Sequence, residues 1–237
     1  MTTLYRMSKQ QPLPPEIHRA MQRMGFLEVE GPLVAEQLTG GVSSDIWRVD
    51  LPGQVVCVKR ALSRLKVAQR WEVSAERNAF EVAWFEAAGD IVPEAVPGLL
   101  GHDPDAGVFV MEYLEPRSYP VWKAALLRGR VELETAVSVG RKLAAIHRGT
   151  AGREEIAARF DTDELFYALR PEPYLVATAE RHPDLAAHLQ SLVQRLMACK
   201  RALVHGDISP KNILVGGGGP VFIDAECAWY GDPAFDL

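Results

Sequence analysis

The stretch Leu203-Val204-His205-Gly206-Asp207-Ile208-Ser209-Pro210-Lys211-Asn212-Ile213-Leu214-Val215 is followed, a short turn later, by Val221-Phe222-Ile223-Asp224. It places two carboxylates, Asp207 and Asp224, and one amide, Asn212, on adjoining loops after short apolar runs. Phosphoryl transfer from a nucleotide needs such a set, because one carboxylate holds the attacking hydroxyl while the amide and the second carboxylate hold magnesium. The stretch therefore predicts a catalytic Asp207 and a Mg²⁺ site at Asn212 and Asp224.

The spacing from Asp207 to Asn212 is the pattern of a kinase catalytic loop. Together with Asp224-Ala225-Glu226 and Gly231-Asp232-Pro233-Ala234-Phe235-Asp236-Leu237, it resembles the aminoglycoside phosphotransferase and choline kinase superfamily, the small-molecule branch of the protein-kinase-like fold. The resemblance extends from Leu38 to Leu237. Within the superfamily, Val58 to Trp71 and Asp224 to Gly231 lean toward methylthioribose kinase.

The resemblance implies a nucleotide site in the first half of the chain. Lys59 lies in Val55-Val56-Cys57-Val58-Lys59, a strand with alternating faces, from which a lysine reaches the α- and β-phosphates. Its carboxylate partner is expected on the following helix, with Glu81 as the first choice and Glu76 as the alternative.

Two backbone segments are expected to contact the same nucleotide. The loop residues Gly40, Gly41, Ser43 and Ser44 would offer N–H groups and hydroxyls to the phosphates. Val110 to Leu114 resembles the hinge between two lobes, which implies that the Glu112 carbonyl and the Leu114 N–H face the adenine. The implied cofactors are ATP or GTP and Mg²⁺.

Further residues near the motif have open or structural roles. His205 is expected to hold the catalytic loop by hydrogen bonds, and His147 to be a satisfied core histidine. Lys211 either contacts the γ-phosphate or an anionic substrate, or faces solvent. The junction that begins at Arg170 falls where substrate-facing helices lie in such enzymes, although Pro-rich junctions are usually only junctions.

The element pattern predicts an α+β fold with two lobes. A helix at 14–24 precedes strands at 34–38, 46–49 and 54–60, a helix from Ser74 to Gly89, and strands at 98–102 and 108–113. After a linker at 115–120, helices are expected at 122–127, 132–148, 163–169 and 183–199, and then a hairpin around Gly216 to Pro220. Residues 1–115 would form the nucleotide-binding N-lobe, which is an antiparallel sheet plus a helix. Residues 116–237 would form a mainly helical C-lobe with the catalytic hairpin. The resemblance implies that the cleft between the two lobes holds the nucleotide.

Composition narrows the classes of partner. The net charge of −5 over 237 residues argues against a nucleic-acid partner, because phosphate backbones favour basic patches. The three cysteines show no metal-ligand spacing and fit thiols in a reducing compartment. No apolar signal core or run of membrane-spanning length is present, so we expect a soluble cytoplasmic protein.

The predicted function is transfer of the γ-phosphate of ATP or GTP to a hydroxyl of a small polar molecule. Aminoglycosides, methylthioribose-like sugars, choline-like alcohols and amino alcohols all stay open as acceptors. Superfamily members usually continue beyond the equivalent of Leu237 with helices that complete the substrate pocket, and this chain is C-terminally short. The alternative to an active kinase is therefore a truncated or non-catalytic nucleotide-binding homologue. A protein-serine kinase ranks low, because no activation loop is evident after Asp224.

Overall fold

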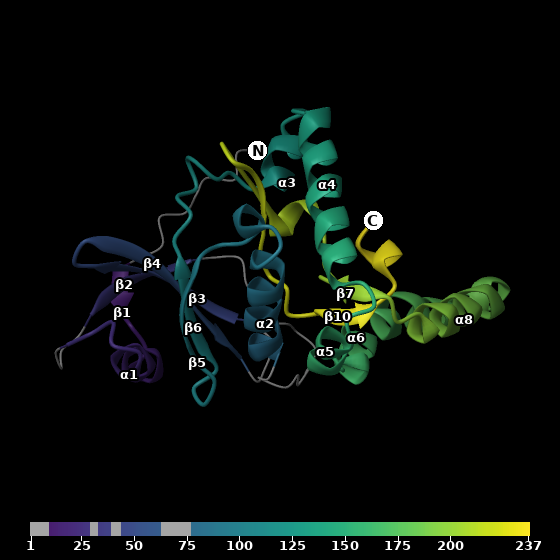
Figure 1. Ribbon diagram of the computed structural model, residues 1–237, viewed down its shortest axis with the longest axis horizontal. Coiled ribbons are helices and arrows are strands. Elements are labelled where there is room, and N and C mark those ends of the chain that lie inside the picture. Colours follow the sequence, from purple (N-terminus) through teal and green to yellow (C-terminus); the bar gives the residue numbers. More distant parts are fainter. Residues whose placement is uncertain (1–9, 29–32, 39–43, 63–76) are drawn as a thin grey trace. The chain divides into compact units, whose positions relative to one another are not determined.

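The computed structural model describes residues 10–28, 33–38, 44–62 and 77–237 of the chain. These residues form two compact units, each of which is described by itself below (Figure 1). The first comprises residues up to Val82 together with Pro97–Leu114, and the second comprises Ala83–Val96 together with Glu115–Leu237. Residues 83–96 thus group with the second unit by their contacts, while the division into lobes after residue 115 stays a prediction.

The first unit is built on a six-stranded antiparallel sheet with the strand order β1-β2-β3-β4-β6-β5. The strands are β1 (Gln10–Pro12), β2 (Val34–Leu38), β3 (Ser44–Leu51), β4 (Gln54–Ala61), β5 (Leu99–Asp103) and β6 (Val108–Glu112). Strands β2 to β6 were predicted close to these bounds. β1 was not predicted, because three polar or proline residues carry no alternating pattern.

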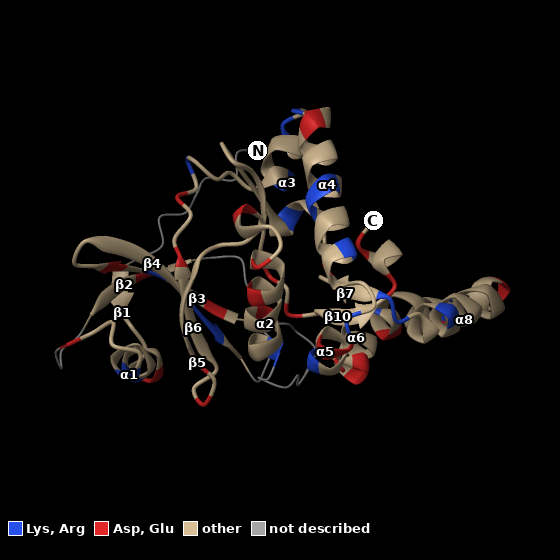
Figure 2. Ribbon diagram, viewed as in Figure 1, with Lys and Arg blue, Asp and Glu red and all other residues tan. Residues whose placement is uncertain are grey.

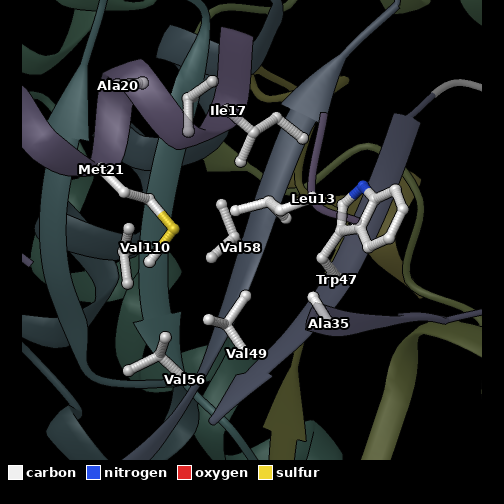
Figure 3. Packing of buried hydrophobic residues seen from close by; sticks show 11 residues of the cluster. Leu13, Ile17, Ala20, Met21, Ala35, Trp47, Val49, Val56, Val58 and Val110 are labelled. Carbon is white, nitrogen blue, oxygen red and sulfur yellow. The ribbon is translucent and has the colours of Figure 1, made fainter. Parts of the chain in front are cut away.

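Helix α1 (Pro15–Arg23) closes one face of this sheet. Its buried residues Ile17, Ala20 and Met21 pack against inward-facing side chains of β3, β4 and β6 (Figure 3). Val56 and Val58 of β4 belong to this core. Because successive side chains along a strand point to opposite faces, Cys57 and Lys59 point to the other face of the sheet. The core therefore fixes which face of β4 presents the lysine.

Helix α2 (Arg77–Gly89) begins in the first unit and continues into the second. The predicted start at Ser74 lies outside the described residues. In its first turn, Arg77 donates to the Leu62 carbonyl at 2.7 Å, and Asn78 donates to the Gly107 carbonyl at 2.7 Å. These two bonds join the start of α2 to the ends of β4 and of the β5–β6 turn, which sets the position of Glu81 one turn later.

The second unit is mainly helical. Its helices are α3 (Trp122–Leu127), α4 (Leu133–Thr150), α5 (Glu154–Arg159), α6 (Asp163–Leu169), α7 (Ala177–Arg181) and α8 (Pro183–Ala198), with a π-helix at Glu172–Val176. Two small antiparallel sheets pair β7 (Ala202–Val204) with β10 (Trp229–Gly231), and β8 (Ile213–Gly216) with β9 (Gly219–Phe222) (Figure 1). Gly217 and Gly218 form the turn of the second pair, so the polyglycine run is the predicted hairpin.

Lys142, a buried lysine of α4, binds this hairpin through hydrogen bonds to backbone carbonyls. The Lys142 ammonium donates to the carbonyls of Pro220 at 3.0 Å, Gly218 at 3.5 Å and Glu94 at 2.9 Å. Burial lowers the pKa of Lys142, and the nearby Glu94 carboxylate opposes that shift. The three carbonyls replace the water that this ammonium loses, so a charged group can lie under the hairpin.

Acidic and basic residues are interspersed over the elements of both units (Figure 2). Among the described residues, no helix is long and apolar enough to cross a membrane.

Candidate active site

In the first unit, Lys59 of β4 and Glu81 of α2 form a buried ion pair. The lysine Nζ lies 2.9 Å from Oε1 and 2.7 Å from Oε2 of the carboxylate, and the two side chains are 3% and 1% exposed. The register Lys59↔Phe109 and Ile46↔Lys59 places the lysine in the middle of the sheet. Glu81 is thus the carboxylate that meets Lys59, and Glu76 lies outside the described residues.

A buried ion pair of this kind adds little net stability, because the free energy that both ions lose on dehydration offsets their attraction. Such pairs therefore suggest a role beyond packing. Here the carboxylate holds the ammonium at a fixed point on the face of the sheet opposite the α1 core. The arrangement can present one fixed positive charge to an anionic ligand.

The predicted backbone contacts of the nucleotide are only partly described. Gly40, Gly41 and Ser43 lie outside the described residues. Ser44 begins β3, is buried, and its hydroxyl has no hydrogen-bond partner among the described residues. Glu112 ends β6, and Leu114 follows it with an N–H that donates to no backbone carbonyl of the described residues. Ser44 and Leu114 therefore keep donors available for a ligand.

In the second unit, the loop that the sequence predicts to be catalytic, residues 205–212, runs from β7 to β8. Its chain passes through Gly206 with φ +79°, a left-handed conformation that glycine adopts freely. A Cβ on Gly206 would lie 2.4 Å from the Cys227 carbonyl oxygen, so the loop passes directly against the segment after Asp224. A short 3-10 turn, Pro210–Asn212, then brings Asn212 back to Asp207.

Two hydrogen-bond donors and one ion-pair partner converge on one oxygen of Asp207. Its Oδ2 accepts from Asn212 Nδ2 at 2.8 Å and from Lys211 Nζ at 2.6 Å, and lies 3.0 Å from Arg170 Nη2. Within the part of the chain that the structure describes, Oδ1 has no donor. The carboxylate is thus fixed at one oxygen and open at the other, which can accept a hydrogen bond from a hydroxyl.

Asp224 and Asn212 have the chemistry of a magnesium site. Asn212 uses its amide nitrogen on Asp207, with bonds to the backbone oxygen at 3.1 Å and to Oδ2 at 2.8 Å, so its amide oxygen points elsewhere with no donor from the described residues. Asp224 has φ +67°, the one non-glycine residue with a left-handed backbone among those described. Carboxylate and amide oxygens are ligands that Mg²⁺ accepts, so the residues present fit this ion.

The two carboxylates act on the same neighbours. Burial lowers the pKa of His205 and is the main cause that raises the pKa of Cys227 to about 12, and the charges of Asp207 and Asp224 act on both groups in the raising direction. The charges of both carboxylates thus reach the same two side chains of the second unit.

His205 is fully buried and holds the loop through both ring nitrogens. The Asp207 N–H donates to Nδ1 at 3.2 Å, which leaves Nε2 to donate to the Ile223 carbonyl at 3.2 Å. The ring also packs edge-on against Trp84 of α2, with centroids 4.7 Å apart. In this neutral form both ring nitrogens are bonded to backbone groups, so His205 holds the loop by hydrogen bonds, as the sequence predicts.

We expect this histidine to make stability sensitive to acid. Burial lowers the pKa of His205 below 6.5, although Asp236, Asp207 and Asp224 oppose the shift. Below about pH 6.5 the unfolded chain binds a proton that the folded chain does not, so the unfolding free energy falls as pH falls, by up to about 1.4 kcal/mol per pH unit. Urea unfolding between pH 7 and pH 5 would show a shallower pH dependence for His205→Gln. Exposed His188→Gln is the control, and equal slopes in wild type and His205→Gln would contradict the assignment.

Asp236 supports the loop from the far end of the chain. Its Oδ2 accepts from the His205 N–H at 2.9 Å and lies 2.9 Å from His147 Nε2, and its Oδ1 accepts from the Gly206 N–H at 3.0 Å. Asp236 lies in the C-terminal motif Gly231 to Leu237, from which no role for its side chain was predicted. His147 is a satisfied histidine as predicted, and its partner is this carboxylate.

Two solved structures share the fold of this chain. The choline/ethanolamine kinase family protein of Mesorhizobium loti has a TM-score of 0.56 and 18% identity, over 93% of this chain and 68% of that chain. Spectinomycin phosphotransferase APH(9)-Ia, solved with ADP and spectinomycin, has a TM-score of 0.57 and 13% identity, over 95% of this chain and 73% of that chain. The fold is thus the bilobal protein-kinase-like fold that the sequence predicts.

The family follows from a sequence model. The model of the phosphotransferase enzyme family matches residues 34–237, so the chain belongs to that family. The methylthioribose kinase of Yersinia enterocolitica is 26% identical over 246 residues, which cover 90% of this chain and 60% of the relative. The chain therefore spans about three fifths of the length of that curated relative.

Proposed function

We propose that the chain is a phosphotransferase that moves the γ-phosphate of ATP or GTP to a hydroxyl of a small polar molecule. The observation that carries the proposal is the state of Asp207, which is held at Oδ2 by two hydrogen bonds and an ion pair and has no donor among the described residues at Oδ1. An acceptor hydroxyl that donates to Oδ1 is oriented for attack on the γ-phosphorus. As the new P–O bond forms, the bond from the γ-phosphorus to the bridging oxygen breaks, ADP or GDP leaves, and the hydroxyl proton passes to this carboxylate.

The cations around Asp207 fit this step. Lys211 and Arg170 both contact Asp207 Oδ2 and so leave Oδ1 to the acceptor hydroxyl. In phosphoryl transfer with a loose transition state, little proton transfer is needed before the phosphate has largely left the nucleotide. A carboxylate that orients the hydroxyl is therefore sufficient.

The remaining residues would bind the nucleotide and its metal. The Lys59 ammonium, held by Glu81, would contact the phosphates, and Ser44 with the neighbouring residues Gly40, Gly41 and Ser43 would cover them. The Glu112 carbonyl and the Leu114 N–H would contact the adenine. Asn212 and Asp224 would hold Mg²⁺, which neutralises negative charge on the phosphates.

A methylthioribose-like sugar is the first acceptor to test. The supporting observation is that curated relatives which cover most of this chain are named methylthioribose kinases. Aminoglycosides, choline and amino alcohols are the other acceptors, because solved proteins with the same fold are named for them.

The test is phosphate transfer by the purified chain from Mg–ATP and from Mg–GTP to each acceptor. We expect acceptor-stimulated turnover that Asp207→Asn lowers by about 10³-fold, because loss of a general base costs on the order of 10²- to 10⁴-fold. Nucleotide binding, measured by calorimetry, should stay within a few fold. The control is Asp184→Asn, an exposed carboxylate on α8. Binding of Mg–ATP without transfer to any acceptor would contradict the proposal and favour a non-catalytic nucleotide-binding homologue.

A further inference from the structure

Arg170 reaches the catalytic loop from a break in the helical chain. Helix α6 ends at Leu169, and Arg170 has φ −128° and ψ −73°, outside the helical region. The residue that follows is Pro171, whose ring disfavours a helical conformation in the residue before it. The chain resumes as the π-helix Glu172–Val176. Arg170 therefore occupies a defined corner between two helical segments.

All three guanidinium nitrogens of Arg170 have partners. Nε donates to the Gly206 carbonyl at 2.6 Å, Nη1 donates to the Leu169 carbonyl at 2.8 Å, and Nη2 lies 3.0 Å from Asp207 Oδ2. The side chain is 15% exposed. Because the guanidinium is planar and rigid, two carbonyl contacts fix the direction of its third contact.

Lys211, the other cation on Asp207 Oδ2, lacks this anchoring. Its side chain is 50% exposed, and within the described part of the chain its one side-chain hydrogen bond is to Asp207 itself. A lysine also carries a compact charge on a flexible stem, so it neutralises the carboxylate without fixing its orientation. The orientation of Asp207 is thus set by Arg170, which precedes Asp207 in the sequence, and by Asn212, which follows it.

We propose that Arg170 is a positioning residue, which orients the Asp207 carboxylate so that Oδ1 meets the acceptor hydroxyl. The inference rests on the proposed function. By tying the corner before the π-helix to Gly206 and Asp207, Arg170 also makes the alignment of the base depend on the segment around Pro171. Displacement of that segment would misalign the base without touching the nucleotide residues.

The first test compares Arg170→Ala, Arg170→Lys and the control Arg195→Ala, an exposed arginine on α8. We expect kcat of Arg170→Ala to fall by about 10- to 100-fold while KM for Mg–ATP changes less than about 3-fold, since misorientation affects the reacting step. Arg170→Lys keeps the charge but places all its donors on one nitrogen, which cannot reproduce the planar fork that contacts three separate oxygens, so it should recover only part of the loss. Added guanidinium should restore activity to Arg170→Ala and not to Arg195→Ala.

A kcat of Arg170→Ala equal to that of wild type would overturn the inference. So would a loss that Arg170→Lys restores in full, because charge alone would then suffice.

The second test needs no turnover. Amide hydrogen exchange in the peptide that covers residues 203–212 reports how firmly the loop is held. We expect exchange at Gly206 and Asp207 to be at least about 10-fold faster in Arg170→Ala than in Arg195→Ala, and equal exchange would overturn the inference. If the wild-type chain transferred phosphate to no acceptor, the proposed function would fail, and this exchange measurement would still decide whether Arg170 holds the loop.

Discussion

Replacement of Asp236 by Ala is expected to destabilise the second unit by about 3 to 5 kcal/mol and to lower turnover more than 100-fold. The carboxylate side chain is 1% exposed and accepts from the backbone N–H groups of His205 and Gly206. A buried donor that loses its partner costs about 1 to 3 kcal/mol, and two such donors would be left, together with His147. The loop would relax to find other partners, and Asp207 would move with it.

Asp236→Asn separates hydrogen bonding from packing. It keeps the shape of the side chain but turns one acceptor oxygen into a donor, which must then face an N–H group or His147. We expect it to lose most of the stability that Ala loses. Urea unfolding and kcat are the measurements, and exposed Asp184→Asn is the control. A change below about 1 kcal/mol in Asp236→Ala would show that the loop does not depend on this carboxylate.

Patterned elements of the fold were predictable from the sequence. β2 (Val34–Leu38), α3 (Trp122–Leu127) and α6 (Asp163–Leu169) have the predicted bounds, because apolar periodicity and turn residues mark their ends. β1 was missed, since Gln10–Pro12 becomes a strand only through pairing with β2. The π-helix at Glu172–Val176 was also missed, because two prolines favour an interpretation as a junction.

In the candidate site, too, the local contacts were predictable from the sequence and the long-range contacts were not. The spacing from Asp207 to Asn212 is local, and the structure has the amide on the carboxylate. Arg170 and Asp236 meet the loop across 36 and 30 residues, and no local pattern records such a contact. Two signals were present: the Arg170–Pro171 pair, which breaks a helix at a charged residue, and the carboxylate of Phe235-Asp236 in the C-terminal motif. Neither indicates its partner without coordinates.

Among glycine-to-alanine substitutions near the site, Gly206→Ala is expected to cause the largest loss of stability and turnover. Gly206 has φ +79°, where an alanine costs about 1 kcal/mol, and the new Cβ would lie 2.4 Å from the Cys227 carbonyl oxygen. Both contacting groups are backbone, so no side chain can rotate away to make room. The loop and the segment after Asp224 must separate, which would move Asp207 and Asp224 apart.

Gly129→Ala provides a matched control for this effect. Gly129 has φ +74°, nearly the same backbone strain, but a Cβ there would meet nothing within 4 Å. We therefore expect Gly129→Ala to cost about 1 kcal/mol with full activity, and Gly206→Ala to cost at least about 3 kcal/mol with turnover lowered more than 100-fold. The difference in unfolding free energy measures the contact with Cys227 separately from the left-handed strain. Equal losses in the two variants would mean that the loop moves away from Cys227 without penalty, and that the close approach of the two loops is not required for the site.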